Sequence, residues 1–304
     1  MRLSTFRLPG VVSNRPPLGG SSAAVERPDS AAGSADYVRF VVLGAGRTGS
    51  NMLVQALNSN PNITCFGELF NWQMDFVGFN VPGYDNFDGQ DKALRDRDFE
   101  EFLRERVYCQ HGQEIQAVGF KLLFAHVSGF PGLAERLAGD SGIRVLHLRR
   151  RNLLRALLSS TIAQTTGVWV EDRKLTVANV RTAVRHPLRV AARLRRPLQR
   201  PKASRVKTAL SAEQCQKFFK KMQWNADVLD DLFREHQKFT LFYEDLLERR
   251  EEVLGQAQSF LGVEPTRLSV TMRRQNPEPL PELLENYDEL YRAFRSTPHA
   301  WMFR

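Results

Sequence analysis

The sequence is poor in cysteine and has no long hydrophobic run. Its three cysteines, Cys65, Cys109 and Cys215, are too few and too widely spaced for a disulfide framework. They fit a reducing compartment, in which they would act as small apolar residues. No apolar run approaches the roughly 20 residues that a transmembrane helix needs. The N-terminus also lacks the continuous apolar segment of a secretory signal, so a cytoplasmic protein is expected.

The sequence also lacks two patterns of binding residues. Its six histidines show no ligand spacing with cysteine or acidic residues, so no metal site is expected. Base-stacking aromatic residues are not interleaved with the basic ones, so no nucleic-acid binding is expected.

Acidic residues are absent from the segment 173–212, which holds twelve of the 43 lysines and arginines. The rest of the chain contains slightly more acidic than basic residues, so the net charge of +9 comes from this one basic insertion. Arg181, Arg185, Arg189 and Arg193 recur at every fourth position, which predicts basic amphipathic helices. Such helices could contact an anionic acceptor or a membrane surface, or they could simply face solvent.

Residues 1–36 are rich in proline, glycine, serine and alanine and lack periodicity, which predicts a disordered tail. The first 25 residues contain arginine and serine but no acid, so an organellar transit peptide is the alternative. Residues 37–304 then form one domain, in which short apolar runs alternate with helical patterns. This alternation predicts an α/β fold with a parallel sheet of about five strands flanked by helices. The expected strands are 38–43, 63–66, 117–124, 144–148 and 239–243.

A strand, a glycine-rich turn and a helix follow one another between residues 38 and 57. The apolar run 38–43 ends at Gly44, and Gly46 and Gly49 follow before the apolar stripe of a helix begins. Glycines let the backbone approach a ligand closely, and the N-terminus of a helix is partially positive. The segment therefore predicts a P-loop-like site for an anionic group.

Three templates compete for this loop. Gly44, Gly46 and Gly49 spell the dinucleotide fingerprint G-x-G-x-x-G, and Glu68 follows as the acid that would bind a ribose. A nucleoside-triphosphate loop requires lysine where Ser50 stands, which argues against a kinase or NTPase. Residues 46–51, GRTGSN, resemble the 5′-phosphosulfate loop of sulfotransferases that use 3′-phosphoadenosine 5′-phosphosulfate (PAPS).

Other segments strengthen the resemblance to PAPS-dependent sulfotransferases. Arg151 ends an expected strand and Ser159 follows eight residues later in a helix, as in the 3′-phosphate motif of that superfamily. The closest likeness is to the bacterial carbohydrate branch, the trehalose-sulfotransferase-like enzymes, which also have arginine at the place of Arg47. It covers roughly residues 38–170 and 239–295. The other matching segments are Gly119–Leu122, Gln164–Trp169, Phe242–Leu246 and Phe260–Val263.

The resemblance implies roles for residues that bind the donor. Arg47 would stabilise charge on the leaving oxygen, and the residues after it would hold the 5′-phosphosulfate. Arg151 and Ser159 would bind the 3′-phosphate, with Arg149 and Arg150 as alternatives one or two positions earlier. Tyr243 would contact the adenine, and Arg273 and Arg274 could close over the nucleotide. The residues expected to hold the phosphosulfate are Thr48, Gly49, Ser50 and Asn51.

The resemblance also implies a reaction. A sulfuryl group would pass in line from PAPS to a hydroxyl of a carbohydrate or glycolipid, without a metal. Glu68 matches the general base of the trehalose-type enzymes, and His126 is the alternative base. Lys121 could neutralise the sulfuryl oxygens.

Two other functions remain open at this point. A dinucleotide-dependent oxidoreductase would explain the three glycines but not the segment Arg151–Ser159. A non-catalytic module could bind anionic polymers or membranes through residues 173–212.

Overall fold

The structure is a computed structural model of the chain, and it describes residues 34–71, 87, 89–127, 129–168, 206–272 and 274–304. Most of the expected N-terminal tail and most of the basic insertion lie outside the described residues. Trp169 and Arg273, which the sequence motifs include, also lie outside them.

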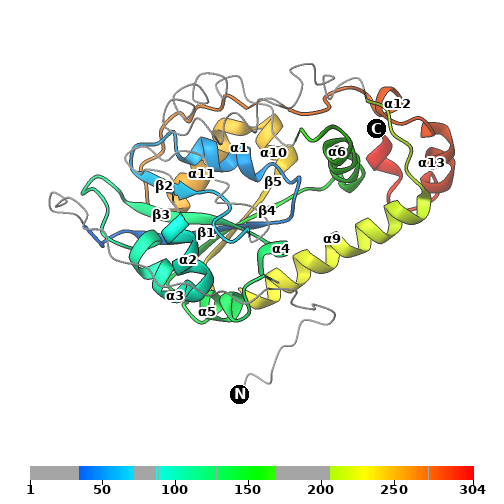
Figure 1. The fold of residues 1–304 in the computed structure, drawn as a ribbon. Coiled ribbons are helices and arrows are strands. Elements are labelled where there is room, and N and C mark those ends of the chain that lie inside the picture. The colour runs from blue at the N-terminus through cyan, green and yellow to red at the C-terminus, as the bar shows by residue number, and fades with distance from the viewer. Residues whose placement is uncertain (1–33, 72–86, 88, 128, 169–205, 273) are drawn as a thin grey trace, which may run out of the picture.

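Five parallel strands form one sheet at the positions that the sequence predicts, which confirms the α/β fold (Figure 1). The sheet order is β2-β3-β1-β4-β5, so β1 lies at the centre and the strands on its two sides follow later in the chain. The strands are β1 Val38–Gly44, β2 Ile63–Phe66, β3 Ala117–Leu123, β4 Arg144–Arg149 and β5 Lys238–Phe242.

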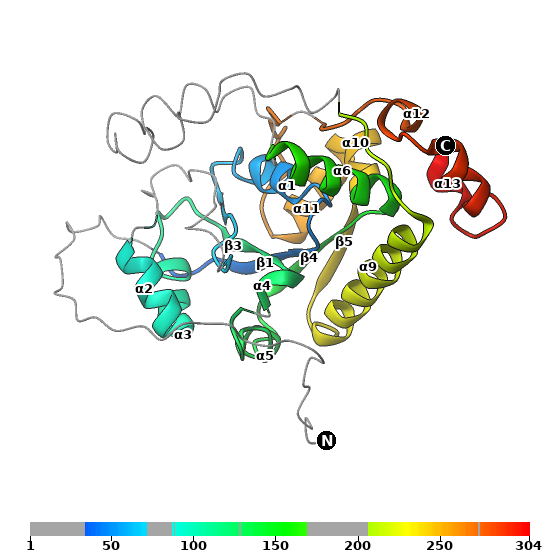
Figure 2. The ribbon, with the colours of Figure 1, turned by 45° about the vertical axis from the view of Figure 1, so that its right-hand side comes forward.

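Helices cover both faces of the sheet (Figures 1 and 2). On one face, Phe40 and Val42 pack against α1, α10 and α11. On the other face, Val41 and Leu43 pack against residues of α3, α5 and the second half of α9. Alternate side chains of β1 are therefore buried on opposite faces, which explains its continuous apolar run. The helices are α1 Ser50–Leu57, α2 Gly89–Arg97, α3 Phe99–Phe102, α5 Leu133–Ala138, α9 Ala212–Leu232, α10 Tyr243–Glu248 and α11 Arg250–Phe260.

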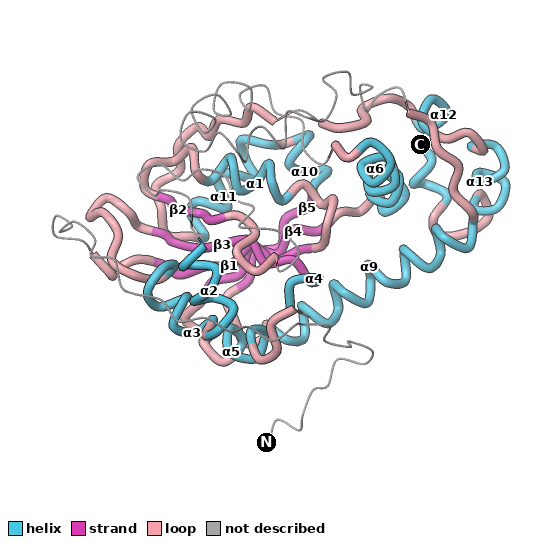
Figure 3. Tube along the Cα trace, viewed as in Figure 1, coloured by secondary structure: helices cyan, strands magenta, loops and turns pink. Residues whose placement is uncertain are grey.

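A third apolar cluster lies beyond the end of β4 and is formed mainly by helices, without a strand (Figure 3). The first half of α9 contributes Phe219 to it, while the second half packs on the sheet through Leu229. Ser211 begins α9 with the capping box that the sequence predicts, in which the Gln214 amide N–H donates to the Ser211 hydroxyl at 3.1 Å. Leu210 and Leu284 flank helices, and the remaining members outside α9 come from α6 Leu153–Thr166, α12 Leu280–Leu283, α13 Tyr287–Phe294 and the 3₁₀ helix η3 Ala300–Phe303.

Two expected elements differ from the structure. The helix expected near residues 92–108 is interrupted, because the Asp98 side chain accepts the amide N–H groups of Glu100 and Glu101 and starts a new helix, which the π-helix Leu103–Val107 continues. The third strand ends at Leu123, one residue earlier than expected, and Phe124 begins α4, Phe124–Val127. This early end turns His126 back toward the end of β3.

Among the described residues, we find no helix with the length and hydropathy that crossing a bilayer requires.

Candidate active site

The predicted site residues lie near the carboxyl ends of the five strands, from Glu68 after β2 to Tyr243 after β5. Parallel sheets bind ligands beyond the carboxyl ends of their strands, where the strand order changes direction. Here that point is β1, whose neighbours are β3 and β4. A dinucleotide fold of the 3-2-1-4-5-6 order places β2 beside β1, but β3 separates them in this chain. The topology therefore argues against Glu68 as a ribose-binding acid.

The loop between β1 and α1 has the backbone of an anion-binding turn. Arg47 and Gly49 both have positive φ angles, of 67° and 89°. The Thr48 hydroxyl donates to the Ala45 carbonyl at 2.8 Å, a hydrogen bond within the loop that stabilises its conformation. A Cβ atom at Gly49 would lie 2.4 Å from the Tyr243 ring, so glycine is required both by φ and by this contact.

Arg47 joins the two motifs that the sequence separates. Its Nη2 and Nε donate to the Ser159 hydroxyl at 2.6 and 3.1 Å, across 112 residues of chain. Nη2 also donates to the Gln275 side chain, which comes from the C-terminal segment. Burial lowers the pKa of the guanidinium, and Tyr243 partly offsets that shift. The expected placement of the loop beside the helix of Ser159 is therefore present in the fold.

Arg149 ends β4 and Arg150 and Arg151 follow it; of these three arginines, Arg150 lies nearest to the loop. Its Nη1 donates to the Arg47 carbonyl at 2.9 Å, and its guanidinium lies 4.6 Å from the centre of the Tyr243 ring. Burial lowers its pKa to about 10. Arg151, the arginine that the motif indicates, is exposed and forms two hydrogen bonds with Asp245 at 2.8 and 2.9 Å.

A second cluster surrounds Glu68. The register pairs Phe66 with Phe120, so the residues that follow β2 lie beside Lys121. The Lys121 ammonium lies 2.5 Å from Glu68 Oε1 and 2.5 Å from Asn51 Oδ1, which links Glu68 to the first turn of α1. Asn71 donates to Glu68 Oε2 at 2.8 Å.

The charge state of Glu68 follows from these contacts. Burial alone raises the pKa of this carboxyl, but the hydrogen bond from His126 and the charge of Lys121 outweigh it and lower the pKa to about 2. Glu68 is therefore ionised at neutral pH.

The tautomer of His126 can be assigned from its hydrogen bonds. The Leu123 amide N–H donates to His126 Nδ1 at 3.2 Å, so the proton of a neutral imidazole must be on Nε2. Nε2 lies 3.4 Å from Glu68 Oε2 and donates toward it. The lone pair on His126 Nδ1 thus already accepts a hydrogen bond from the Leu123 backbone N–H. This arrangement favours Glu68 over His126 as a proton acceptor.

We expect Lys121→Met to lower the free energy of unfolding by about 3 kcal/mol at pH 7, because it leaves a buried carboxylate without its cation. Burial then raises the pKa of Glu68 above its usual value of about 4.3. The loss should be full above that raised pKa, should shrink as the pH falls through it, and should disappear only as the pH approaches the wild-type value of about 2. Urea unfolding at pH 7 and at about pH 2 measures it. The double variant Lys121→Met/Glu68→Gln should recover most of the loss, and a loss independent of pH would contradict this assignment.

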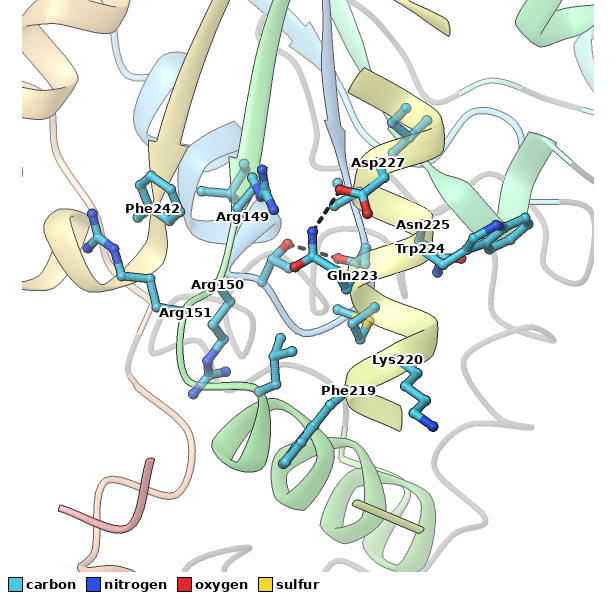
Figure 4. A pocket seen from close by; sticks show the side chains of 18 of the residues that line it. Arg149, Arg150, Arg151, Phe219, Lys220, Gln223, Trp224, Asn225, Asp227 and Phe242 are labelled. Carbon is cyan, nitrogen blue, oxygen red and sulfur yellow. Dashed lines mark hydrogen bonds between the residues drawn. The ribbon is translucent and has the colours of Figure 1, made fainter. Parts of the chain in front are cut away.

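A cavity of about 720 Å³ opens beside the glycine-rich loop, between the end of β4, α9 and η3 (Figure 4). Gly44, Ala45 and Thr48 form part of its wall. Figure 4 shows the three arginines at the end of β4, Arg149 to Arg151, on one side and side chains of α9 on the other. The cavity could not be predicted from the sequence, because α9 and η3 carry no binding motif.

Among the described residues, no three histidine, cysteine or acidic side chains lie close enough together to hold a metal ion. The absence of a metal from the reaction stays a prediction.

No protein-family model matches the chain. Nodulation protein H of Rhizobium tropici is 30% identical over 269 residues, which cover 87% of this chain and 92% of that protein. Nodulation protein H of Rhizobium meliloti is 25% identical over 267 residues, which cover 87% and 94%. A solved sulfotransferase from Alicyclobacillus acidocaldarius aligns with a TM-score of 0.45 at 18% identity, over 92% of this chain and 95% of that one.

Proposed function

The chain belongs to the sulfotransferase family that includes Nodulation protein H, and on this premise we propose that it transfers a sulfuryl group from PAPS to a carbohydrate or glycolipid hydroxyl. The observation that carries the proposal is the contact between Arg47 and Ser159. It joins the loop suited to a 5′-phosphosulfate with the helix suited to a 3′-phosphate, as a donor phosphorylated at both ends requires.

The residues around Arg150 fit a phosphate group. Arg150 Nε is buried without a hydrogen-bond partner. The charge of Arg274 lowers the pKa of both Arg150 and Arg155, after burial, so three cations lie near one another. A buried guanidinium with an unused donor and like-charged neighbours is stabilised by a bound anion. We therefore assign the 3′-phosphate to Arg150 with Ser159, one position before the arginine that the motif indicates.

This assignment predicts different effects for two neighbouring arginines. Arg150→Met should raise the Kd for 3′-phosphoadenosine 5′-phosphate (PAP) by about 10- to 100-fold, because a charge-assisted hydrogen bond is lost. Arg151→Met, which removes a surface ion pair with Asp245, should change it by less than about threefold. Calorimetric titration measures both. The same titration with adenosine 5′-phosphate, which lacks the 3′-phosphate, should show little effect of either variant. A larger loss of PAP affinity in Arg151→Met than in Arg150→Met would show that Arg151 binds the 3′-phosphate.

The remaining donor contacts follow from the loop. The backbone N–H groups at the start of α1, from Gly49 to Asn51, and the hydroxyl of Ser50 would hold the 5′-phosphosulfate together with Arg47. The Thr48 hydroxyl already donates within the loop, so we assign Thr48 a backbone contact. Tyr243 packs on Gly49 and on Arg150, which suits a residue beside the nucleoside.

Each catalytic residue has a separate role in the proposed reaction. The bond from the sulfur to the acceptor oxygen forms as the bond from the sulfur to the 5′-phosphate oxygen of the donor breaks. Glu68 takes the proton of the acceptor hydroxyl. Arg47 stabilises the negative charge that develops on the leaving phosphate oxygen. His126 and Asn71 hold the Glu68 carboxylate by hydrogen bonds.

Lys121 connects the proposed base to the donor-binding loop, because its ammonium contacts both Glu68 and Asn51. Anionic oxygens of the donor at the loop would compete with Glu68 for its ammonium. That competition would raise the pKa of Glu68 from about 2 toward the range of a useful base when the donor is bound.

Two measurements test the proposed function. Calorimetry should show that the protein binds PAP and does not bind NAD(H) or NADP(H). Incubation with PAPS labelled in its sulfur and a panel of sugars, oligosaccharides and glycolipids should then label at least one acceptor. Binding of a dinucleotide without binding of PAP would contradict the proposal. Contact of residues 173–212 with an anionic surface and a cytoplasmic location remain predictions.

A further inference from the structure

Exposed tryptophans line the cavity beside the loop. Among the described residues, Trp224, Tyr291 and Trp301 are the large hydrophobic side chains most open to solvent, with exposed fractions of 44%, 42% and 44%. Trp224 and Trp301 both border the cavity, although they come from α9 and η3. Flat aromatic side chains that remain exposed around one cavity mark a ligand surface rather than a core.

A buried hydrogen-bond acceptor lies in the same wall. Asn225 borders the cavity and is only 6% exposed, yet its Oδ1 has no hydrogen-bond partner. An unpaired buried amide oxygen is costly, and a ligand that donates a hydrogen bond would satisfy it. Lys220 and Gln223 of the same helix also border the cavity, and the Gln223 side-chain amide N–H donates to Asp227 at 2.7 Å (Figure 4).

Three of the four cations in the cavity wall already have partners within the protein. Arg149 is paired with Asp230 at 3.3 Å, and Arg151 with Asp245 at 2.8 Å. The remaining wall residues include one cation, Lys220, and one anion, Asp227, besides Arg150, which is directed to the loop and Tyr243. A wall with paired charges favours a neutral ligand over an anionic one.

The cavity adjoins both halves of the active site. Gly44, Ala45 and Thr48 of the glycine-rich loop border it. At another edge the Trp224 ring packs edge-on against Phe124, with 5.5 Å between ring centres. Phe124 begins the helix that carries His126, the partner of Glu68. A ligand in the cavity therefore contacts the loop, and the Trp224 ring separates it from the helix that carries His126.

We propose that this cavity binds a neutral oligosaccharide portion of the acceptor. Trp224 and Trp301 present flat apolar surfaces to the C–H faces of sugar rings, and Asn225 Oδ1 accepts a hydrogen bond from a sugar hydroxyl. The volume of about 720 Å³ is within the range of about 300–1,000 Å³ that is usual for ligand sites. The assignment rests on the proposed function, because it names where the acceptor of that reaction lies.

Calorimetric titration of the full-length protein, saturated with PAP, tests this assignment. The neutral probes are maltotetraose, cellotetraose and the tetramer of N-acetylglucosamine, and a sulfated heparin tetrasaccharide is the anionic probe. We expect at least one neutral probe to bind more tightly than the anionic one. Trp301→Ala should raise its Kd about tenfold or more, as truncation of an aromatic anchor does. Asn225→Leu should weaken it as well, while PAP affinity stays unchanged in both variants.

Tyr291→Ala is the matched control. Tyr291 is as exposed as Trp301 and packs on Phe303 of the same 3₁₀ helix, with 5.9 Å between ring centres, but it does not border the cavity. General loosening of that helix would appear in this variant too. Equal losses in Tyr291→Ala and Trp301→Ala, preference for the sulfated probe, or no neutral binding up to about 10 mM with PAP bound would overturn the assignment. Failure to bind PAP would instead count against the proposed function.

Discussion

Glu68→Gln is expected to lower kcat by about 10²- to 10⁴-fold, the usual contribution of a positioned general base. The amide keeps the shape of the side chain but cannot take the acceptor proton. Its effect on donor binding should be small, because Lys121 and Arg47 remain beside the loop. We therefore expect PAP affinity to change by less than about threefold. Rates of transfer from labelled PAPS and calorimetry with PAP measure the two quantities on the same preparation.

Two control variants accompany this experiment. Glu264→Gln removes an exposed carboxylate from the loop after α11 and should leave kcat unchanged. His126→Gln should lower kcat less than Glu68→Gln does, because His126 orients the base and does not accept the proton. If Glu68→Gln retained full activity and His126→Gln lost it, the base would be His126.

Arg47→Met is expected to lower kcat by about 10²- to 10³-fold, the cost of removing one charged group from a developing oxyanion. It also removes the donor of both hydrogen bonds to Ser159, so PAP affinity should fall as well. Arg47→Lys should recover part of kcat, because an ammonium supplies the charge without the planar fork. Transfer rates at saturating PAPS measure the effect on kcat apart from the effect on binding.

Arg39→Met is a matched control for Arg47→Met. Arg39 lies on the same strand, β1, but near its other end, where it pairs with Asp140 at 2.7 Å. Its loss should lower stability slightly and leave kcat unchanged. An Arg47→Met enzyme with unchanged kcat would show that the charge on the leaving oxygen is stabilised by another residue, of which Lys121 is the nearest candidate.

The expected strands and the glycine-rich turn could be predicted because their signals are local. The apolar residues of β1 follow from burial on both faces, and Gly49 follows from a positive φ angle. The capping box likewise depends on only four consecutive residues, from Ser211 to Gln214. The split of the helix after Asp98 was missed, although Asp98 is itself a capping signal, because the apolar pattern continues across it.

The choice among Arg149, Arg150 and Arg151 could not be made from the sequence. All three lie at the end of one strand, β4, and their partners lie 81, 103 and 94 residues away in the chain. Asp245 pairs with Arg151 only because β5 lies beside β4, which leaves Arg150 nearest to the loop.

The sequence by itself determined the fold class, the anion-binding turn and the identity of Glu68 as a candidate base. Only the tertiary structure decided that β3 separates β2 from β1, which places Lys121 between Glu68 and the loop and argues against a dinucleotide site. Only the tertiary structure likewise forms the cavity, because its two tryptophans come from helices that lie far apart in the chain. The physical reason is that turns and helix starts depend on neighbouring residues, whereas strand order and cavity walls depend on contacts between segments far apart in the chain.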